Sequence, residues 1–375
     1  MKEYQKALQR CREEGTYRSL ISLKSEGKYV KVGGQKLLNL SGNDYLGLLD
    51  MPELWQQFLS SAPHLAPSSA SSRLLSGNDE AYALFEEELC SLYDKESALL
   101  WDSGYHANSG IIPVLAVPHT LIVADRLVHA SIIDGIRLSG APFVRFRHND
   151  PQHLTQILEK NHREYEQIWI VTESLFSMDG DFAPLTEIIQ VKKQYSNVYL
   201  YLDEAHAVGV RGAQGLGYAS ELGLLNDVDL LVGTLGKALG SVGAYSLQSQ
   251  ILKELLISKA RPMIFSTALP PVMVEWSRFI FHQQLEMNGH REYLKEITQL
   301  FSELMGQPFT SQIAPIIISG EAALQEKVTQ LTEAGYFVRP IRKPTVPAGS
   351  ERIRISLNAA LTKQEVRDLA KHLRQ

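Results

Sequence analysis

An apolar run that ends in acidic residues lies near the middle of the chain: Val198-Tyr199-Leu200-Tyr201-Leu202-Asp203-Glu204-Ala205-His206. Its apolar part is continuous rather than alternating, which is typical of a strand covered on both faces of a parallel sheet. Comparable runs, separated by helix-sized segments, recur at residues 121–124, 143–146, 168–171, 230–232 and 243–245. This pattern predicts an α/β fold whose larger domain is built on a mostly parallel sheet.

The last hundred residues show a different pattern. Residues 352–357 alternate polar and apolar side chains, which is typical of a strand with one wet face. Thr362 and Glu365 have the spacing of a capping box that begins a terminal helix. We therefore predict a large domain at 41–275 and a small α+β domain at 276–375, with residues 1–40 packing against the small domain.

Composition excludes several classes of protein. The 375 residues carry 37 Lys and Arg against 42 Asp and Glu, a formal net charge of −5, so no basic face indicates a nucleic-acid or membrane partner. Cys11 and Cys90 are too few for a disulfide framework or a thiolate zinc site, and no metal is expected. We see neither a signal peptide nor an uncharged apolar stretch near 20 residues, and expect a soluble, cytoplasmic protein.

Asp203 is the first candidate for chemistry, because ligands bind at the carboxyl ends of parallel strands. Position alone fits a turn or helix-capping residue equally well. The same Asp-Glu-Ala-His letters occur in the acidic box of certain helicases, which would make the chain an NTPase with a phosphate loop. Leu231 and Ala238 occupy the positions where such a loop needs Gly and Ser or Thr, so the sequence disfavours that alternative.

Lys237 is the second candidate. It follows the predicted strand at 229–232 through a short Gly-containing turn, 34 residues after Asp203 (237 − 203). A lysine flanked by Gly236 and Ala238 suits an imine-forming nucleophile, although a solvated lysine is the simpler interpretation of the residue alone. An acid and a lysine at successive strand ends together indicate pyridoxal 5'-phosphate (PLP), whose enzymes use both.

Eight segments, in order along the chain, resemble the α-oxoamine synthase family of fold-type I PLP-dependent transferases. The resemblance covers about residues 39–360, and its motifs lie at 43–47, 72–77, 103–105, 125–131, 173–181, 203–209, the Lys237 turn and 344–347. It implies a PLP-dependent acyltransferase that joins an amino acid to an acyl thioester with loss of CO2.

The resemblance also implies roles around the cofactor. Lys237 would bind PLP covalently, Asp203 would face its ring nitrogen, and His129 would stack on the ring. These three are the implied catalytic residues. The other implied cofactor-binding residues are His206 at the phenolic oxygen, Ser177 beside the ring, Gly104, Tyr105 and Thr234 at the phosphate, and Ser266 and Thr267 from the partner subunit of a homodimer.

Substrate recognition calls for a cation, and an arginine fork suits an amino-acid carboxylate better than a lysine. Arg352 and Arg354 share one face of the predicted strand, so alternation cannot choose between them. The resemblance favours Arg354, assisted by Asn43, and gives His129 a second role at the substrate.

For the acyl substrate, the residues that match family positions are Arg18, Arg342 and Thr345, and the match is loose. Exposed arginines without a catalytic role are an equally good interpretation. Within the resemblance, residues 341–347 favour the family members that use L-alanine and pimeloyl-CoA or pimeloyl-acyl carrier protein, a step of biotin biosynthesis. Glycine with acetyl-CoA is the alternative within the family.

Overall fold

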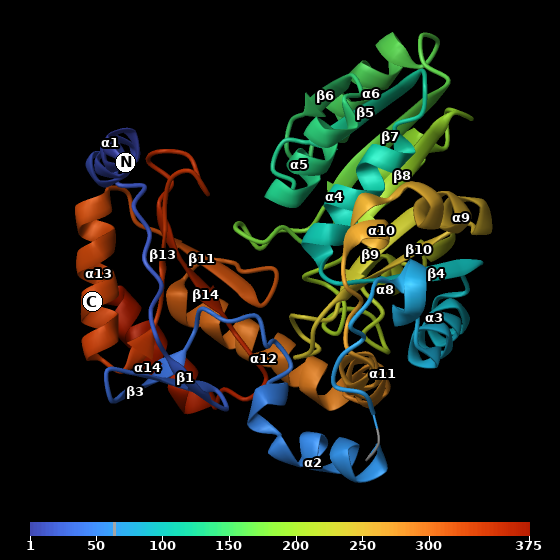
Figure 1. Cartoon of the computed structure of the whole chain (residues 1–375). Coiled ribbons are helices and arrows are strands. Elements are labelled where there is room, and N and C mark those ends of the chain that lie inside the picture. The colour runs from blue at the N-terminus through green and yellow to red at the C-terminus, as the bar shows by residue number, and fades with distance from the viewer. Residues whose placement is uncertain (63–64) are drawn as a thin grey trace. The chain divides into compact units, whose positions relative to one another are not determined.

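The computed structural model describes residues 1–62 and 65–375 and divides them into two compact units. The larger unit comprises Pro52–Ser177 and Phe182–Arg291. The smaller unit comprises Met1–Met51, Met178–Asp181 and Glu292–Gln375. Figure 1 shows the whole chain, and each unit is described by itself below.

The described part of the larger unit contains a seven-stranded sheet with strand order β4-β10-β9-β8-β7-β5-β6. All neighbours from β9 to β6 pair in parallel, whereas β10 is antiparallel to both β9 and β4. The strands are β4 (Ser97–Trp101), β5 (Thr120–Asp125), β6 (Phe143–Phe146), β7 (Gln167–Glu173), β8 (Val198–Asp203), β9 (Leu230–Thr234) and β10 (Ala244–Gln248). The predicted α/β fold with a mostly parallel sheet is confirmed.

Helices cover this sheet and bury its apolar side chains. On one face, α4 (Gly104–Leu115) and α5 (Ala130–Ser139) form a core with the strands through residues such as Ile111, Ile132 and Trp169. Continuous apolar strands of this kind require cover on both faces. The remaining helical elements are α2 (Pro52–Ser61), η2 (Arg73–Gly77), α3 (Glu80–Tyr93), α6 (Pro151–Asn161), α7 (Leu185–Lys192), α8 (Tyr218–Glu221), η3 (Leu225–Asp227), α9 (Gln250–Lys259), α10 (Arg261–Phe265) and α11 (Pro271–Leu285).

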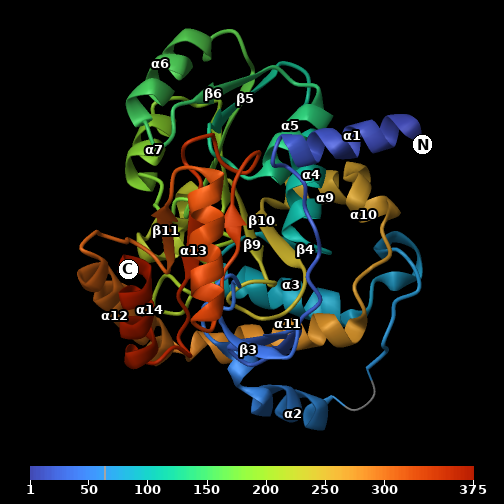
Figure 2. The same cartoon turned by 90° about the vertical axis from the view of Figure 1, so that its left-hand side faces the viewer.

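The smaller unit holds two short sheets, with orders β1-β2-β3-β12 and β11-β14-β13. Its α13 (Glu321–Glu333), which is labelled in Figure 2, lies against β12, β13 and β14. Thr362 caps α14 (Lys363–Arg374) in a capping box with Glu365, as predicted. The other elements are α1 (Lys2–Glu13), β1 (Lys24–Glu26), β2 (Tyr29–Val32), β3 (Gln35–Asn39), η1 (Leu48–Asp50), α12 (Asn288–Met305, whose first four residues belong to the larger unit), β11 (Ile313–Ile317), β12 (Tyr336–Phe337), β13 (Pro340–Ile341) and β14 (Arg352–Ser356).

The expected wet face of the strand at 352–357 is wrong. All five residues of β14 are buried, including Arg352 and Arg354. Both guanidinium groups are bound by polar atoms of the same unit, so the alternating pattern places paired arginines, rather than solvated ones, on that face.

The units divide at residues 51/52 and 291/292, whereas we predicted domain limits at 40 and 275. Helix α11 explains the later division, because Phe281 packs against Phe85, Tyr93 and Tyr245 within the larger unit. Residues 1–40 lie in the smaller unit, where β3 pairs in parallel with β12. Within residues 1–62 and 65–375, no helix combines the length and the apolar character needed to cross a membrane.

Candidate active site

A cavity of about 300 Å³ opens in the larger unit where β7, β8 and β9 end, and its volume lies within the range of small-molecule sites. Polar and charged residues from strand ends, loops and the start of α4 line it. Seven of the predicted site residues are among them: Gly104, Tyr105, His129, Asp203, His206, Thr234 and Lys237. The fold therefore brings these residues, which are far apart in the sequence, into one cavity.

Asp203 is the last residue of β8 and is only 5% exposed. The side-chain amide of Asn108 donates to its Oδ2 at 2.8 Å, and the backbone N–H of Ala205 donates to its Oδ1 at 2.9 Å. Each carboxylate oxygen thus accepts a hydrogen bond, an arrangement suited to an ionised acid. Asp203 can therefore hold a cationic N–H group inside the cavity.

Lys237 lies in the loop that joins β9 to β10. Its Nζ is 2.9 Å from Nε2 of His206, which lies in the turn after β8 and is buried. Backbone bonds close the loop on itself, since Leu235 donates to Gly243 and Gly240 donates to the carbonyl of Lys237. The primary amine is therefore presented to the cavity from a short hairpin.

His129 begins α5 as its N-cap. Its backbone N–H donates to Oε1 of Glu173 at 2.5 Å, and its Nδ1 is 2.7 Å from the hydroxyl of Ser131. Burial lowers the pKa of His129, although Asp203 opposes that shift. A mainly neutral imidazole results near pH 7, which suits stacking on an aromatic ring.

Glu173, at the end of β7, is also buried in the cavity wall. Burial raises the pKa of its carboxyl well above the ordinary value, and the charge of Asp203 adds to the effect. A raised pKa favours the uncharged form of the Glu173 carboxyl.

The start of α4 is shaped for an anion. Ser103 caps the helix by accepting from the backbone N–H of His106, and the first-turn N–H groups that follow attract negative charge. A Cβ at Gly104 would lie 2.7 Å from a methyl carbon of Thr234, so glycine is needed for this close approach to β9. The hydroxyl of Tyr105 donates to Asp134 on α5.

Within the smaller unit, the two candidate arginines have different partners. Arg352 forms a salt bridge with Asp179 at 2.6 Å and donates to the carbonyl of Met178. Arg354 donates to Oδ1 of Asn43 at 3.1 Å and to the hydroxyl of Tyr45 at 2.8 Å. The structure thus places Arg354 beside Asn43 and gives Arg352 an acidic partner.

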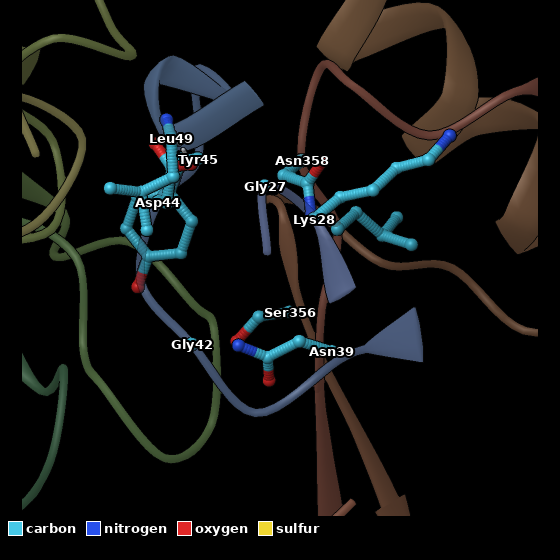
Figure 3. Close-up of a pocket in the computed structure, with 10 residues that line it drawn as sticks. Gly27, Lys28, Asn39, Gly42, Asp44, Tyr45, Leu49, Ser356 and Asn358 are labelled. Atoms are coloured by element: carbon cyan, nitrogen blue, oxygen red, sulfur yellow. Dashed lines mark hydrogen bonds between the residues drawn. The ribbon is translucent and has the colours of Figure 1, made fainter. Parts of the chain in front are cut away.

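Arg354 also donates to the hydroxyl of Ser356 at 2.9 Å. Ser356 and Tyr45 are two of the residues that line a small pocket, whose volume of about 20 Å³ admits one water molecule (Figure 3). The pocket is too small for a metabolite, and its residues Tyr45 and Ser356 hold Arg354 in place.

The three acyl-substrate candidates lie together on the smaller unit. Arg18 donates to the hydroxyl of Thr345 at 3.0 Å. Arg342 donates to the carbonyl of Tyr17 at 2.9 Å and forms a salt bridge with Glu321. Arg18 and Thr345 are exposed and Arg342 is half-buried, so this cluster can reach a ligand in solvent.

Ser177, Ser266 and Thr267 are not among the residues that line the cavity. Ser266 faces a separate small pocket together with Asp102, and Thr267 is exposed. Because Ser266 and Thr267 are assigned to the site of a partner subunit, a single chain does not test that prediction.

Sequence reasoning missed Asn108, Ser131 and Glu173 as cavity residues. Sequence signals exist for Asn108 and Glu173. Asn108 follows Gly104 by four residues, which places both on one face of a helix, and Glu173 ends a strand as Asp203 does.

Comparison with known proteins identifies the class. Residues 35–373 match the family described as aminotransferase class I and II, and the chain belongs to that family. Its relatives and structural neighbours are α-oxoamine synthases, so it is a fold-type I PLP-dependent acyltransferase. This membership removes the NTPase alternative.

Individual relatives give finer detail. The chain is 48% identical to a "Putative 8-amino-7-oxononanoate synthase" of Haemophilus influenzae, with 100% of both chains covered. It is 47% identical to a protein of the same description from Neisseria meningitidis serogroup A, with 99% of each chain covered.

Solved structures agree in fold. A serine palmitoyltransferase of S. paucimobilis with a bound PLP-myriocin aldimine is 26% identical, with a TM-score of 0.89 over 99% of this chain and 96% of that one. An 8-amino-7-oxononanoate synthase of Francisella tularensis is 26% identical, with a TM-score of 0.75 over 90% of this chain and 96% of that one.

The cavity fits the cofactor of this class. PLP presents a phosphate, an aldehyde and a pyridine nitrogen, and the cavity offers a helix N-terminus, a primary amine and a buried carboxylate to match them. Glycine at position 104 lets the start of α4 approach Thr234, which lines the same cavity.

Proposed function

We propose that this enzyme condenses L-alanine with pimeloyl-CoA or pimeloyl-acyl carrier protein to give 8-amino-7-oxononanoate, CO2 and free CoA or carrier. The observation that carries the proposal is 47–48% identity to relatives of that description over 99–100% of both chains. The wider class, a PLP-dependent acyltransferase, does not depend on the choice of substrates.

Residues of the larger unit would hold the cofactor. Lys237 would bind it covalently, Asp203 would face its ring nitrogen, and the start of α4 with Thr234 would bind its phosphate. His206 would hydrogen-bond its phenolic oxygen. Bound PLP would supply an electron-withdrawing ring that accepts the electron pair left at the substrate Cα.

Once the amino group of L-alanine has displaced it from the cofactor, Lys237 would have a free amine and would act as the general base. Its amine would remove the proton from Cα of L-alanine and return a proton at the end of the reaction. The contact of 2.9 Å between Lys237 Nζ and His206 Nε2 supports this role, because the imidazole can orient the amine. Asp203 would keep the adjoining ring nitrogen protonated throughout.

His129 would serve the acyl transfer. A neutral imidazole can lie against the cofactor ring and donate a hydrogen bond to the carbonyl oxygen of the thioester. Arg354, with Asn43, would bind the carboxylate of L-alanine through charge-assisted hydrogen bonds until that group leaves as CO2. Arg18, Arg342 and Thr345 would bind the acyl substrate.

We place the enzyme in the cytoplasm as a homodimer. In that assembly Ser266 and Thr267 would complete the phosphate site of the partner subunit, while Ser177 would lie beside the cofactor ring of its own chain.

The test is a substrate matrix. Purified enzyme with PLP is given glycine, L-alanine or L-serine against acetyl-, succinyl-, pimeloyl- and palmitoyl-CoA, and against pimeloyl-acyl carrier protein, with thiol release and product mass as readouts. We expect turnover with L-alanine and a pimeloyl thioester only. Turnover restricted to glycine and acetyl-CoA would replace the proposed substrates with those of glycine C-acetyltransferase and leave the class intact.

A further inference from the structure

Asn108 occupies the centre of a buried hydrogen-bond network to which the chemistry above assigns no role. It projects from α4 into the cavity wall and is 2% exposed. Its Nδ2 donates to Oδ2 of Asp203 at 2.8 Å and to Oγ of Ser131 at 2.9 Å. Its Oδ1 accepts from the hydroxyl of Tyr201 at 2.5 Å. One amide therefore connects the end of β8 to the start of α5.

Tyr201 fixes which way this amide faces. Burial raises the pKa of the Tyr201 phenol well above its ordinary value, and the nearby charge of Asp203 adds to that shift. The hydroxyl therefore stays protonated and donates to Oδ1 of Asn108. The two hydrogens of Nδ2 are then directed to Asp203 and Ser131, and each has an acceptor.

The donor and acceptor roles in this network are also fixed at His129. Because Oγ of Ser131 accepts from Asn108, its own hydrogen is available to Nδ1 of His129, 2.7 Å away. The backbone N–H of Ser131 also points to that nitrogen, at 3.2 Å. With two donors directed at it, Nδ1 acts as the acceptor, and a neutral His129 carries its proton on Nε2.

We propose that Asn108 is a positioning residue for both cofactor-facing groups of the cavity. Through its direct bond it aims the Asp203 carboxylate at the cofactor ring nitrogen. Through Ser131 it holds His129 as the Nε2–H tautomer. This inference rests on the proposed function, which places His129 at the thioester: an Nε2–H group donates to a carbonyl oxygen, whereas the other tautomer would present a lone pair there.

The first test determines the tautomer of His129 by NMR. The 15N spectra of wild-type protein labelled with 15N-histidine are compared with those of the Ser131→Ala and Asn108→Ala variants at about pH 8. The His129→Asn variant assigns the resonances. We expect wild-type His129 with a proton on Nε2 and none on Nδ1, and in both variants a shift toward the exchanging mixture of an exposed histidine. A proton on Nδ1 in the wild-type protein would overturn the proposal.

The second test reads the orientation of Asp203 through cofactor binding. Asn108→Ala is expected to weaken PLP affinity about tenfold and to change the visible absorption of the bound cofactor, because a charge-assisted hydrogen bond is lost. Ser109→Ala, one residue along the same helix, removes only a bond to the carbonyl of Tyr105 and should leave both unchanged. Unchanged affinity and absorption in Asn108→Ala would contradict the positioning role.

Tyr201→Phe keeps the proposal testable if Asn108→Ala does not fold, since it preserves the ring and removes only the donor to Oδ1. We expect PLP affinity about threefold weaker, because the Asn108 amide loses the donor that anchors its oxygen and is held less firmly against Asp203. No effect on either readout would count against the proposal. Both tests are run without amino acid or thioester, so their outcome is separate from that of the substrate matrix.

Discussion

The cavity of the larger unit and the arginine cluster of the smaller unit hold their polar groups in different ways. Asp203, Asn108 and His129 are fixed by several hydrogen bonds inside the cavity wall. Arg18 and Thr345 meet each other at the surface, with their side chains exposed to water. If the proposed roles hold, cofactor chemistry uses preorganised groups, whereas acyl recognition uses solvated groups that contribute less free energy each.

Lys237→Ala is expected to have the largest effect on turnover, and it tests the role of the preorganised groups in the cavity. We expect turnover to fall more than about a thousandfold, because both the covalent attachment and the general base are lost. Borohydride reduction followed by peptide mass analysis should tag Lys237 in the wild-type enzyme. Lys193→Ala removes an exposed lysine paired with Asp227 and should keep full activity. A tag on another lysine would disprove the assignment.

Glu204 tests whether a buried carboxyl group next to the cavity lowers the stability of the protein when it is ionised. Its carboxyl accepts from the backbone of Tyr218 and Ala219, yet burial raises its pKa to about 7. The folded state therefore binds this proton more tightly than the unfolded state, whose pKa is near 4.5. The stabilisation of about 3 kcal/mol that this difference contributes is present below about pH 4.5 and lost as pH rises through about 7.

Urea unfolding at several pH values measures this effect in the wild-type protein and in Glu204→Gln. The wild-type stability should fall with rising pH relative to the variant. Glu254→Gln, at an exposed position on α9, serves as control. Parallel pH profiles for wild type and Glu204→Gln would show that the buried carboxyl titrates normally.

Arg352 and Arg354 lie on one strand but have different partners, so their substitutions should have different effects. Arg354→Lys should raise the KM for L-alanine about tenfold with less effect on kcat, since a bidentate fork is replaced by a point charge. Arg352→Lys should leave that KM unchanged and lower stability by about 1 kcal/mol, because its partner Asp179 is partly solvated. The reverse result would exchange the roles of the two arginines.

Arg18→Ala is the smallest expected effect. Loss of an exposed guanidinium should raise the KM for the acyl thioester about threefold, with the KM for L-alanine unchanged. Arg12→Ala, on the neighbouring exposed helix α1, is the control. A loss of a hundredfold would show that the surface cluster is organised as tightly as the cavity.

Local sequence signals predicted much of the larger unit. Continuous apolar runs identified β5 to β10, and residues at strand ends identified Asp203 and Lys237, because a parallel sheet collects its carboxyl ends at one edge. Strand β4 and the antiparallel direction of β10 were not predicted. Both depend on pairing between residues such as Leu100 and Tyr245, which are far apart in the chain.

What could not be predicted depends on partners distant in sequence. The two arginines of β14 look alike in the alternating pattern, and only Asp179 and Tyr45 distinguish them. Asn108 likewise resembles an ordinary helical asparagine until Tyr201 and Asp203 are placed beside it.

The antiparallel pairing of β10 with β9 has a consequence for motion. Thr234 and Ala244 are paired across the sheet, so the nine residues 235–243 are anchored at both ends. We therefore expect the backbone of Lys237 to move little, so that its amine would move mainly by rotation about the four-carbon side chain. Lengthening this loop by one residue should therefore slow every proton transfer without weakening the affinity for phosphate.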